Sequence, residues 1–497
     1  MLGNILLGLT NVVAPLNLIM LLGGVLVGLV VGATPGLTGV MAVAILVPLT
    51  YGIDPTMAFV LFTAVYAVSV YSGSITAVLF RTPGTSESAA TVLDGYEMTK
   101  KGKPHEALGH AMFSSFLGGT IGAILLLFIA PQLARVALEF GSPEVFALIA
   151  FTMVAVASLG VGNQAKGILC AIFGLFLATI GLDIITGVPR YTFGVPILYA
   201  GLQFIPVILG LFAVSEALRT IQGSVTVGRV IEKTKTTLPG IKTIKKLLPT
   251  YLQSIPIGVG IGALPGVGAT TASFVSYSQA VRWSKHPERF GTGIPEGIAA
   301  PESANNAAAM TAMVPLLSLG IPGSATTAVM LGAFLMFGLR PGPLLFSQQP
   351  VFVYTIMIAA IIANLLIIAV SPLFIRGFAR ILQVPTGVLA TIILILCVVG
   401  SFAIRNNLVD VWMVFLFGFV GYALDKYEYP TAPIAIGLIL GQLGEQEFRR
   451  SLVLSGGTPM IFLINPISAV FLGLSILMLL APVFRILRRR LSISKAK

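Results

Sequence analysis

The stretch from Gly293 to Thr327, GIPEGIAAPESANNAAAMTAMVPLLSLGIPGSATT, decides how this chain is interpreted. It places Glu296, Glu302 and the adjacent pair Asn305 and Asn306 within an apolar chain, and four prolines interrupt it. Lipid cannot hydrogen-bond a free backbone group, so broken helices at membrane depth survive only inside protein or along a watery cavity. Polar and ionisable residues at that depth are costly and are functional candidates. The alternative interpretation is a re-entrant turn or a surface loop between two spans.

The composition is that of a membrane protein. Of 497 residues, 56% are hydrophobic and 10% are charged, and the mean hydropathy is +0.98. A soluble domain has about 25% charged residues. At roughly 20 residues per span, the apolar runs predict an all-α polytopic membrane protein with about ten to fourteen helical elements. A β-barrel is excluded because the apolar runs are continuous rather than alternating.

The net charge of +12 is concentrated in two segments. Basic residues cluster between residues 215 and 246 and again from Arg485 to the C-terminus. The positive-inside rule places both segments in the cytoplasm. The first 80 residues contain neither Lys nor Arg, so we expect the N-terminus outside and no cleavable signal peptide. Cys170 and Cys397 lie in apolar runs and are expected to be core residues.

Four Pro-Gly interruptions indicate an internal repeat. GATPGLTG at 32–39 and GALPGVGA at 262–269 share a Gly-Ala-x-Pro-Gly frame. Each is followed by a second break, TPGT at 82–85 and IPGS at 321–324. If the first half starts outside and the second starts from a cytoplasmic linker, the copies are inverted. Inverted repeats with broken helices, re-entrant hairpins and a site near the midplane are typical of secondary transporters.

This organisation predicts four segments. Residues 1–214 form the first membrane repeat, 215–249 a basic cytoplasmic linker and 250–456 the second membrane repeat. Residues 457–497 form a C-terminal span and a basic cytoplasmic tail.

The breaks have a chemistry suited to anions. Proline removes a backbone donor and glycine allows close approach of a ligand to the backbone. Amides at the start of the following helix favour an anion such as a carboxylate. Nearby hydroxyls can donate to that carboxylate or, with freed carbonyls, ligate sodium, but each can equally cap or back-bond its own helix. The predicted substrate-binding residues at the breaks are Pro35, Gly36, Thr38, Thr82, Pro83, Gly84, Thr85, Pro265, Gly266, Pro322, Gly323 and Ser324.

Glu302, Asn305 and Asn306 share one helix face because they are spaced at i, i+3 and i+4. Amide side chains both donate and accept without a fixed charge, so Asn305 and Asn306 join the predicted substrate-binding residues. Glu302 is either a ligand of a coupling cation or a cap partner of its helix. The predicted cation ligands are Thr34, Thr270 and Glu302, with sodium as the only metal considered.

Two charged residues near the first breaks are further candidates. Arg81 can pair with a substrate carboxylate or extend to the membrane interface, and Asp94 lies shortly after it.

No catalytic constellation competes with transport. The histidines are scattered, no metal-binding spacing, P-loop or nucleophile elbow occurs, and Asp183 lacks an evident second acid. We therefore expect neither enzymatic activity nor a cofactor.

Several of these segments resemble a known family. EGIAAPESANNAAAMTAMVPLLSLGIPGSATTAV at 296–329, GATPGLTG at 32–39, YSGSITAVLFRTPG at 71–84 and LDGYEMTKKGKPHEALG at 93–109 resemble the large membrane subunit of tripartite tricarboxylate transporters, the TctA family. The resemblance spans essentially the whole chain, and the PESANNA motif is highly specific.

The resemblance implies partners and a substrate class. Such a subunit works in the bacterial inner membrane with a small four-span membrane subunit and a periplasmic substrate-binding protein. It imports tricarboxylates or related organic anions, generally driven by an ion gradient. Two alternatives stay open, a stand-alone carboxylate symporter and a membrane-embedded enzyme acting on lipid-borne substrates.

Overall fold

The computed structural model of the chain describes residues 1–159, 163–222, 236–381 and 385–494. The chain divides into two compact units. Unit 1 combines Met1–Leu138 with Phe204–Lys426, and unit 2 combines Glu139–Gln203 with Tyr427–Lys497. Each of the two predicted repeats therefore contributes residues to both units.

The regular elements of unit 1 are all helices over its described residues. Its first part contains α1 (Leu2–Val12), α2 (Pro15–Ala33), α3 (Gly39–Leu49), α4 (Pro55–Phe80), η1 (Ser86–Ser88), α5 (Val92–Lys100) and α6 (Pro104–Ala137). Its second part contains α9 (Phe204–Ile208), the π-helical η3 (Leu209–Val214), α10 (Ser215–Gln222), α11 (Ile241–Ala263), α12 (Gly268–Trp283), η4 (Pro287–Arg289), α13 (Glu296–Thr311), α14 (Met313–Leu319), α15 (Ala325–Met336), α16 (Pro343–Gln348), α17 (Pro350–Ile381), α18 (Thr386–Arg405) and α19 (Leu408–Lys426).

Unit 2 is smaller and contains the few strand residues of the described chain. Its elements are α7 (Ser142–Leu159), α8 (Gln164–Ala178), β1 (Gly181–Leu182), β2 (Pro189–Arg190), η2 (Pro196–Ala200), α20 (Ala432–Leu454), α21 (Ile461–Ile464) and α22 (Pro466–Ser494). Strands β1 and β2 pair antiparallel in a short hairpin.

The predicted all-α polytopic fold is confirmed. In the described ranges, seven helices are long and apolar enough to cross a membrane, and six shorter apolar helices accompany them. Several predicted runs became short helices because proline and glycine interrupt them, as at α3, which has 11 residues. The predicted basic linker is partly helical, since α10 and the start of α11 fall within it. Residues 223–235 lie outside the described chain.

Two helices form the buried centre of unit 1. Helix α4 starts at Pro55, where the Asp54 carboxylate accepts from two amides of the first turn, and it is buried from Ala58 to Leu79. Helix α13 is buried from Gly297 to Thr311. A helix that is buried all round must pack against small residues or fill every groove around it.

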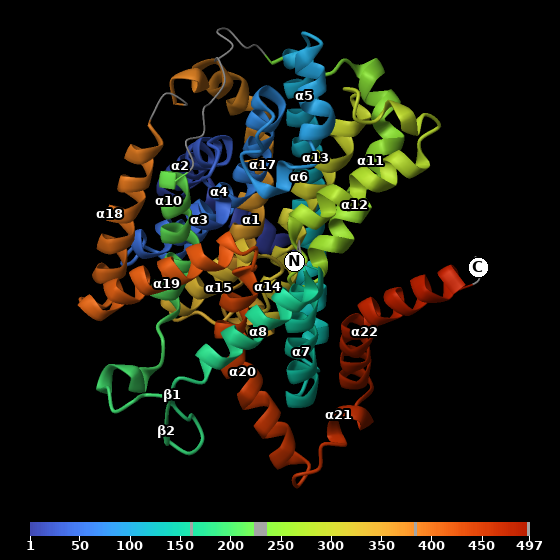
Figure 1. Cartoon of the computed structure of the whole chain (residues 1–497). Coiled ribbons are helices and arrows are strands. Elements are labelled where there is room, and N and C mark those ends of the chain that lie inside the picture. Colours follow the sequence, from blue (N-terminus) through green and yellow to red (C-terminus); the bar gives the residue numbers. More distant parts are fainter. Residues whose placement is uncertain (160–162, 223–235, 382–384, 495–497) are drawn as a thin grey trace. The chain divides into compact units, whose positions relative to one another are not determined.

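Glycines let the neighbouring helices approach these two helices closely. A Cβ added at Gly28 or Gly32 of α2 would lie 3.0 or 2.2 Å from a carbonyl oxygen of α4. A Cβ added at Gly258 or Gly262 of α11 would lie 2.3 Å from a carbonyl oxygen of α13 in each case. Small residues allow this close packing where the hydrophobic effect cannot drive helices together. In Figure 1, α2, α3 and α4 lie beside one another, as do α11, α12 and α13.

Two long helices, α6 and α17, join the two parts of unit 1. Helix α6 packs on α13 through Gly118 and Gly122, whose added Cβ atoms would meet the backbone of Ser303 and Ala307. Helix α17 packs on α4 and on α1. Each central helix is thus covered by a long helix from the other part.

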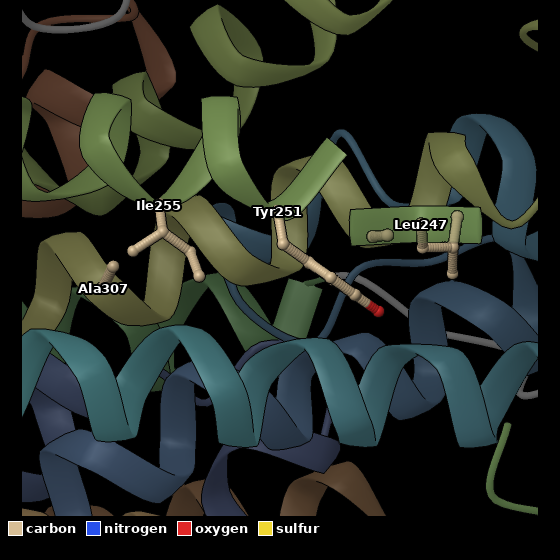
Figure 2. Close-up of a cluster of buried hydrophobic side chains, with 5 residues drawn as sticks. Leu247, Tyr251, Ile255 and Ala307 are labelled. Carbon is tan, nitrogen blue, oxygen red and sulfur yellow. The ribbon is translucent and has the colours of Figure 1, made fainter. Parts of the chain in front are cut away.

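An apolar cluster fastens α11 to this centre. Leu247, Tyr251 and Ile255, spaced four residues apart on α11, pack with Ala299 and Ala307 of α13. Figure 2 shows the three α11 side chains along one face of their helix, with Ala307 near Ile255. Four-residue spacing places side chains on one stripe of a helix, so the alignment of the three α11 side chains follows from the sequence.

Candidate functional site

The two predicted breaks of the first half lie against each other. We call residues 34–38 and 82–85 the first pair of breaks. A Cβ added at Gly84 would lie 2.0 Å from the carbonyl oxygen of Gly32, at the end of α2. The Gly84 amide donates to the Gly73 carbonyl of α4 at 3.1 Å. Backbone of one break therefore contacts backbone at the other, which only glycine permits.

The two breaks of the second half both pack on the α13–α14 segment. We call residues 264–267 and 321–324 the second pair of breaks. A Cβ added at Gly262 would lie 2.3 Å from the Ala308 carbonyl oxygen, and one added at Gly323 would lie 2.6 Å from that of Ala312. Ala308 and Ala312 are one helical turn apart. The ends of α11 and of the second break therefore approach neighbouring turns of the α13–α14 segment.

The contacts of the two pairs correspond residue by residue. Gly32 meets Ser69 and Ser72, and Gly262 meets Ala308 and Thr311. The glycines are 230 positions apart, and both partner residues are 239 positions apart. Gly84 and Gly323, with their partners Gly73 and Ala312, are also 239 positions apart. The sequence frame of Pro-Gly breaks is thus matched by a frame of equivalent close contacts.

Backbone conformation follows the same correspondence. Gly36 and Gly266 have positive φ values of 88° and 77°. Arg81 and Gly320, which end α4 and α14, are both left-handed caps with φ of 59° and 70°. Such caps satisfy carbonyls at a helix C-terminus and normally use glycine. Arg81 is exposed, so its side chain does not enter the buried space between the breaks.

The segments after the second breaks share one hydrogen bond and differ in another. Ser88 Oγ donates to the Thr85 carbonyl at 2.9 Å, and Thr327 Oγ1 donates to the Ser324 carbonyl at 2.9 Å. Ser324 also accepts from the Thr327 amide in a capping box that starts α15. Thr85 Oγ1 is buried and has no hydrogen-bond partner among the described residues.

Two hydrogen bonds cross between the halves at these breaks. The Tyr66 hydroxyl of α4 lies 3.0 Å from Ser324 Oγ, at the second-half break. Asn305 Nδ2 of α13 donates to the Glu87 carbonyl at 3.0 Å, beside the first-half break. The structure therefore brings the predicted Asn305, Thr85 and Ser324 into one region of unit 1. Tyr66 was not predicted, because α4 contains several hydroxyl residues and no local pattern distinguishes this one.

Asn306 lies next to this region. Its Nδ2 donates to the Glu302 carbonyl at 3.0 Å and to Asn305 Oδ1 at 2.7 Å. Its Oδ1 is buried and has no hydrogen-bond partner among the described residues. A buried amide oxygen without a partner costs free energy unless a ligand or water binds it.

Glu302 is held by hydroxyl groups. Thr91 Oγ1 donates to Glu302 Oε1, and Ser115 Oγ donates to Oε2 at 2.8 Å. Glu302 is fully buried inside α13, so it does not act as an N-terminal cap partner. No Lys or Arg of the described chain forms an ion pair with it. A buried carboxyl group without a cationic partner is stable as the neutral acid or with a bound cation.

The remaining predicted hydroxyls satisfy local backbone. Thr34 Oγ1 donates to the Val30 carbonyl at 2.7 Å, and Thr38 caps α3 by accepting from the Met41 amide at 3.2 Å. Thr82 Oγ1 donates to the Phe80 carbonyl at 3.4 Å. These are the cap and back-bond alternatives that the sequence left open, and each hydroxyl keeps lone pairs for a further ligand.

Thr270 and the four prolines occupy the edges of the breaks. Thr270 Oγ1 donates to Ser86 Oγ at 3.1 Å, joining α12 to the first-half break. The prolines that open the turns are buried or half-buried; they are Pro35, Pro83, Pro265 and Pro322.

Asp94 connects α5 to the loop before α13. Its carboxylate accepts from the amides of Gly291, Gly293 and Ile294 at 2.7 to 3.0 Å and from the Tyr277 hydroxyl at 2.9 Å. Asp94 is fully buried. With four donors already bound, its role here is to position the entry to α13.

Unit 2 has a separate group of charges. Asp183, Arg190, Glu445 and Arg449 form ion pairs of 2.6 to 3.5 Å beside a cavity of about 200 Å³. Hydrogen bonds hold the pKa of the Asp183 carboxyl below its ordinary value, and the bond from the backbone N–H of Thr186 contributes most. In the described ranges, no group of three or more His, Cys, Asp or Glu could hold a metal ion.

The fold and the paired breaks define a class of protein. It is a multi-pass, all-α membrane protein whose centre is built from interrupted helices with buried polar groups, as in secondary transporters. The model of the tripartite tricarboxylate transporter TctA family matches residues 18–436, and the chain belongs to this family.

Two relatives come from Agrobacterium vitis. One is an uncharacterized 52.8 kDa protein in the TAR-I ttuC' 3'region, 37% identical over 417 residues, covering 84% of this chain and 83% of the relative. The other is an uncharacterized protein in the TAR-II ttuC' 3'region, 40% identical over 216 residues, covering 44% of this chain and 89% of the relative. No solved structure matches the chain.

Family membership makes the chain a tricarboxylate transporter subunit. The predicted recognition of the TctA family is confirmed. Because TctA is a family of transporters, membership also favours transport over the enzyme alternative.

Proposed function

We propose that this chain is the membrane permease subunit of a binding-protein-dependent secondary transporter in a bacterial inner membrane. It imports a tricarboxylate or a related organic anion. The observation that supports this function best is the pairing of Pro-Gly breaks, in which equivalent glycines of each half approach the backbone of α4 and of the α13–α14 segment.

The anion binds at the breaks, where buried hydroxyl and amide side chains of both halves lie. The Thr85 hydroxyl is buried without a protein partner among the described residues, and it can donate to an anion in this region. Asn306 Oδ1 is also without such a partner, but as an acceptor it suits a cation or a water instead. Asn305 bonds the Glu87 carbonyl beside the first-half break, and Tyr66 bonds Ser324 at the second-half break. Hydrogen bonds to a charged group contribute about 1.5–3 kcal/mol each, so a few suffice for micromolar binding.

Uptake is coupled to sodium or to protons through Glu302, Thr34 and Thr270. The carboxyl group of Glu302 accepts from the hydroxyls of Thr91 and Ser115 and forms no ion pair with a Lys or Arg of the described residues, which suits a site that is alternately neutral and charged. Proteoliposomes carrying either a sodium gradient or a proton gradient separate the two ions. Uptake that responds to neither gradient contradicts coupling.

The two halves have inverted membrane topology, with residues 215–249 and the C-terminal tail in the cytoplasm and residue 1 outside. The clustered basic residues support this orientation. Single cysteines placed at residue 2, in the linker and in the tail, labelled from each side, test it. A linker that is labelled from outside removes the inverted arrangement.

The permease acts with a small four-span membrane subunit and a periplasmic binding protein. The test is uptake of labelled citrate and other carboxylates by proteoliposomes with all three components and with this chain alone. We expect uptake with the complete system and little with the single chain. Strong uptake by the single chain supports the stand-alone symporter instead.

A further inference from the structure

Tyr66 and Asn305 occupy matched positions in the two halves. The contacts of Gly84 with Gly73 and of Gly323 with Ala312 relate the halves by 239 positions. The same separation relates Tyr66 of α4 to Asn305 of α13. Both side chains are buried, with exposed fractions of 2% and 0%.

Each of the two side chains reaches the break of the opposite half. Tyr66 bonds Ser324, which caps α15 after the second-half break. Asn305 bonds the carbonyl of Glu87, in η1 after the first-half break. One position of the repeated frame therefore carries a polar side chain in both halves, and both cross the same region in opposite directions.

The two crossings are not equally satisfied. Ser324 Oγ is bound by Tyr66 and by the Thr327 amide. Its counterpart Thr85 is 4% exposed, and the Thr85 Oγ1 has no hydrogen-bond partner among the described residues. A buried hydroxyl without a partner is costly, so an anion that accepts from it gains affinity. The Tyr66 hydroxyl at the matched crossing is paired with Ser324 Oγ, and it can donate to an anion in place of that partner.

We propose that Tyr66 is a substrate-binding residue of the carboxylate site. Its phenol hydroxyl leaves Ser324 Oγ when the substrate enters and donates to a carboxylate oxygen, opposite the Asn305 side chain that bonds the Glu87 carbonyl. This inference rests on the proposed function as a carboxylate permease. Neither the composition of the chain nor a sequence motif indicated this role for Tyr66.

The test compares Tyr66→Phe with Tyr251→Phe in the complete reconstituted transporter. Tyr251 is an equally buried tyrosine whose hydroxyl lies 3.1 Å from Ser114 Oγ, in the apolar cluster of Figure 2. Both substitutions remove one hydroxyl from a hydroxyl pair. We expect Tyr66→Phe to raise the KM for citrate about tenfold, with little change in kcat or in membrane abundance. Tyr251→Phe leaves KM unchanged.

A second readout covers a loss of folding. Carboxylate-dependent thermal stabilisation of the purified complex is measured for both variants. We expect Tyr66→Phe to lose most of the stabilisation and Tyr251→Phe to keep it. An unchanged KM in Tyr66→Phe, or equal losses in Tyr66→Phe and Tyr251→Phe, overturns the inference. If the wild-type complex neither transports nor binds any carboxylate, the proposed function fails instead.

Discussion

The two second breaks, at 82–85 and at 321–324, have the same backbone contacts but different side chains. Each glycine packs on a small residue of its central helix, and each following hydroxyl residue accepts a bond through its carbonyl. The turn residue before them is Arg81 in one break and Gly320 in the other. Close backbone packing therefore defines the repeated frame, whereas the side chains on it differ between the halves.

The central helices differ in the same sense. Position 302 of α13 is Glu302, and the matched position of α4 is Thr63, a buried hydroxyl without a partner among the described residues. Asn306 is matched by Ala67. The second half therefore contributes the acid and the amides, and the first half contributes hydroxyls. A site between them is chemically asymmetric although its scaffold is repeated.

The largest expected effect comes from filling the frame itself. Gly84→Ala places a Cβ 2.0 Å from the Gly32 carbonyl oxygen, and Gly323→Ala places one 2.6 Å from that of Ala312. Backbone cannot yield as a flexible side chain can, so we expect each variant to lose about 3 kcal/mol or more of stability. Membrane abundance, thermal stability and uptake are the measurements.

The control for this pair is Gly23→Ala, because an added Cβ there meets nothing within 4 Å. It should leave abundance and uptake at the wild-type level. If Gly84→Ala or Gly323→Ala behaves like this control, the two breaks are not held by the close contacts described.

The next effect concerns the amides that only the second half carries. Asn305→Ala and Asn306→Ala should each reduce uptake at least about tenfold, since a hydrogen bond to a charged group is worth about 1.5–3 kcal/mol. Insertion and assembly should stay near normal. Ser215→Ala is the control, because the Ser215 hydroxyl only back-bonds the Leu211 carbonyl of its own helix. Normal transport by both asparagine variants makes α13 a structural helix and moves the site to the first pair of breaks.

A smaller effect is expected at Gly73 and Ala312, the matched residues that contact the two second breaks. A Cβ at Gly73 would lie 2.4 Å from Thr85 Oγ1 and 2.9 Å from the Thr85 amide, whereas the matched residue is already Ala312. Gly73→Ala should displace Thr85 at a cost of about 1–3 kcal/mol and reduce uptake several-fold. Ala312→Gly should cost about 0.5–1 kcal/mol and leave KM unchanged. Equal effects of the two changes on KM count against a special role of Thr85.

The smallest effect is expected at the left-handed turn. Arg81→Gly relieves a left-handed conformation that costs about 1–2 kcal/mol, but glycine loses about 0.5–1 kcal/mol more backbone entropy. The melting temperature should therefore change little, and uptake should be unaffected because Arg81 is exposed. A loss of uptake at unchanged stability shows that the guanidinium acts on the substrate.

Features that depend on local composition and spacing could be predicted from the sequence. The long apolar runs predicted the membrane helices, and the four Pro-Gly breaks predicted where helices are interrupted and how the halves repeat. The stripe at Leu247, Tyr251 and Ile255 follows from helical periodicity. The PESANNA motif indicated the family, and the family match confirmed it.

The pairing of polar residues that are distant in the sequence depends on how the helices pack. Tyr66 and Ser324 are 258 positions apart, and Asn305 and Glu87 are 218 apart, so no local pattern could pair them. Asp94 looked like a possible site residue until its four donors were seen. Thr34 and Thr38 proved to bond their own helices. Local sequence sets what a side chain can donate or accept, but the packing of distant helices decides which partner it finds.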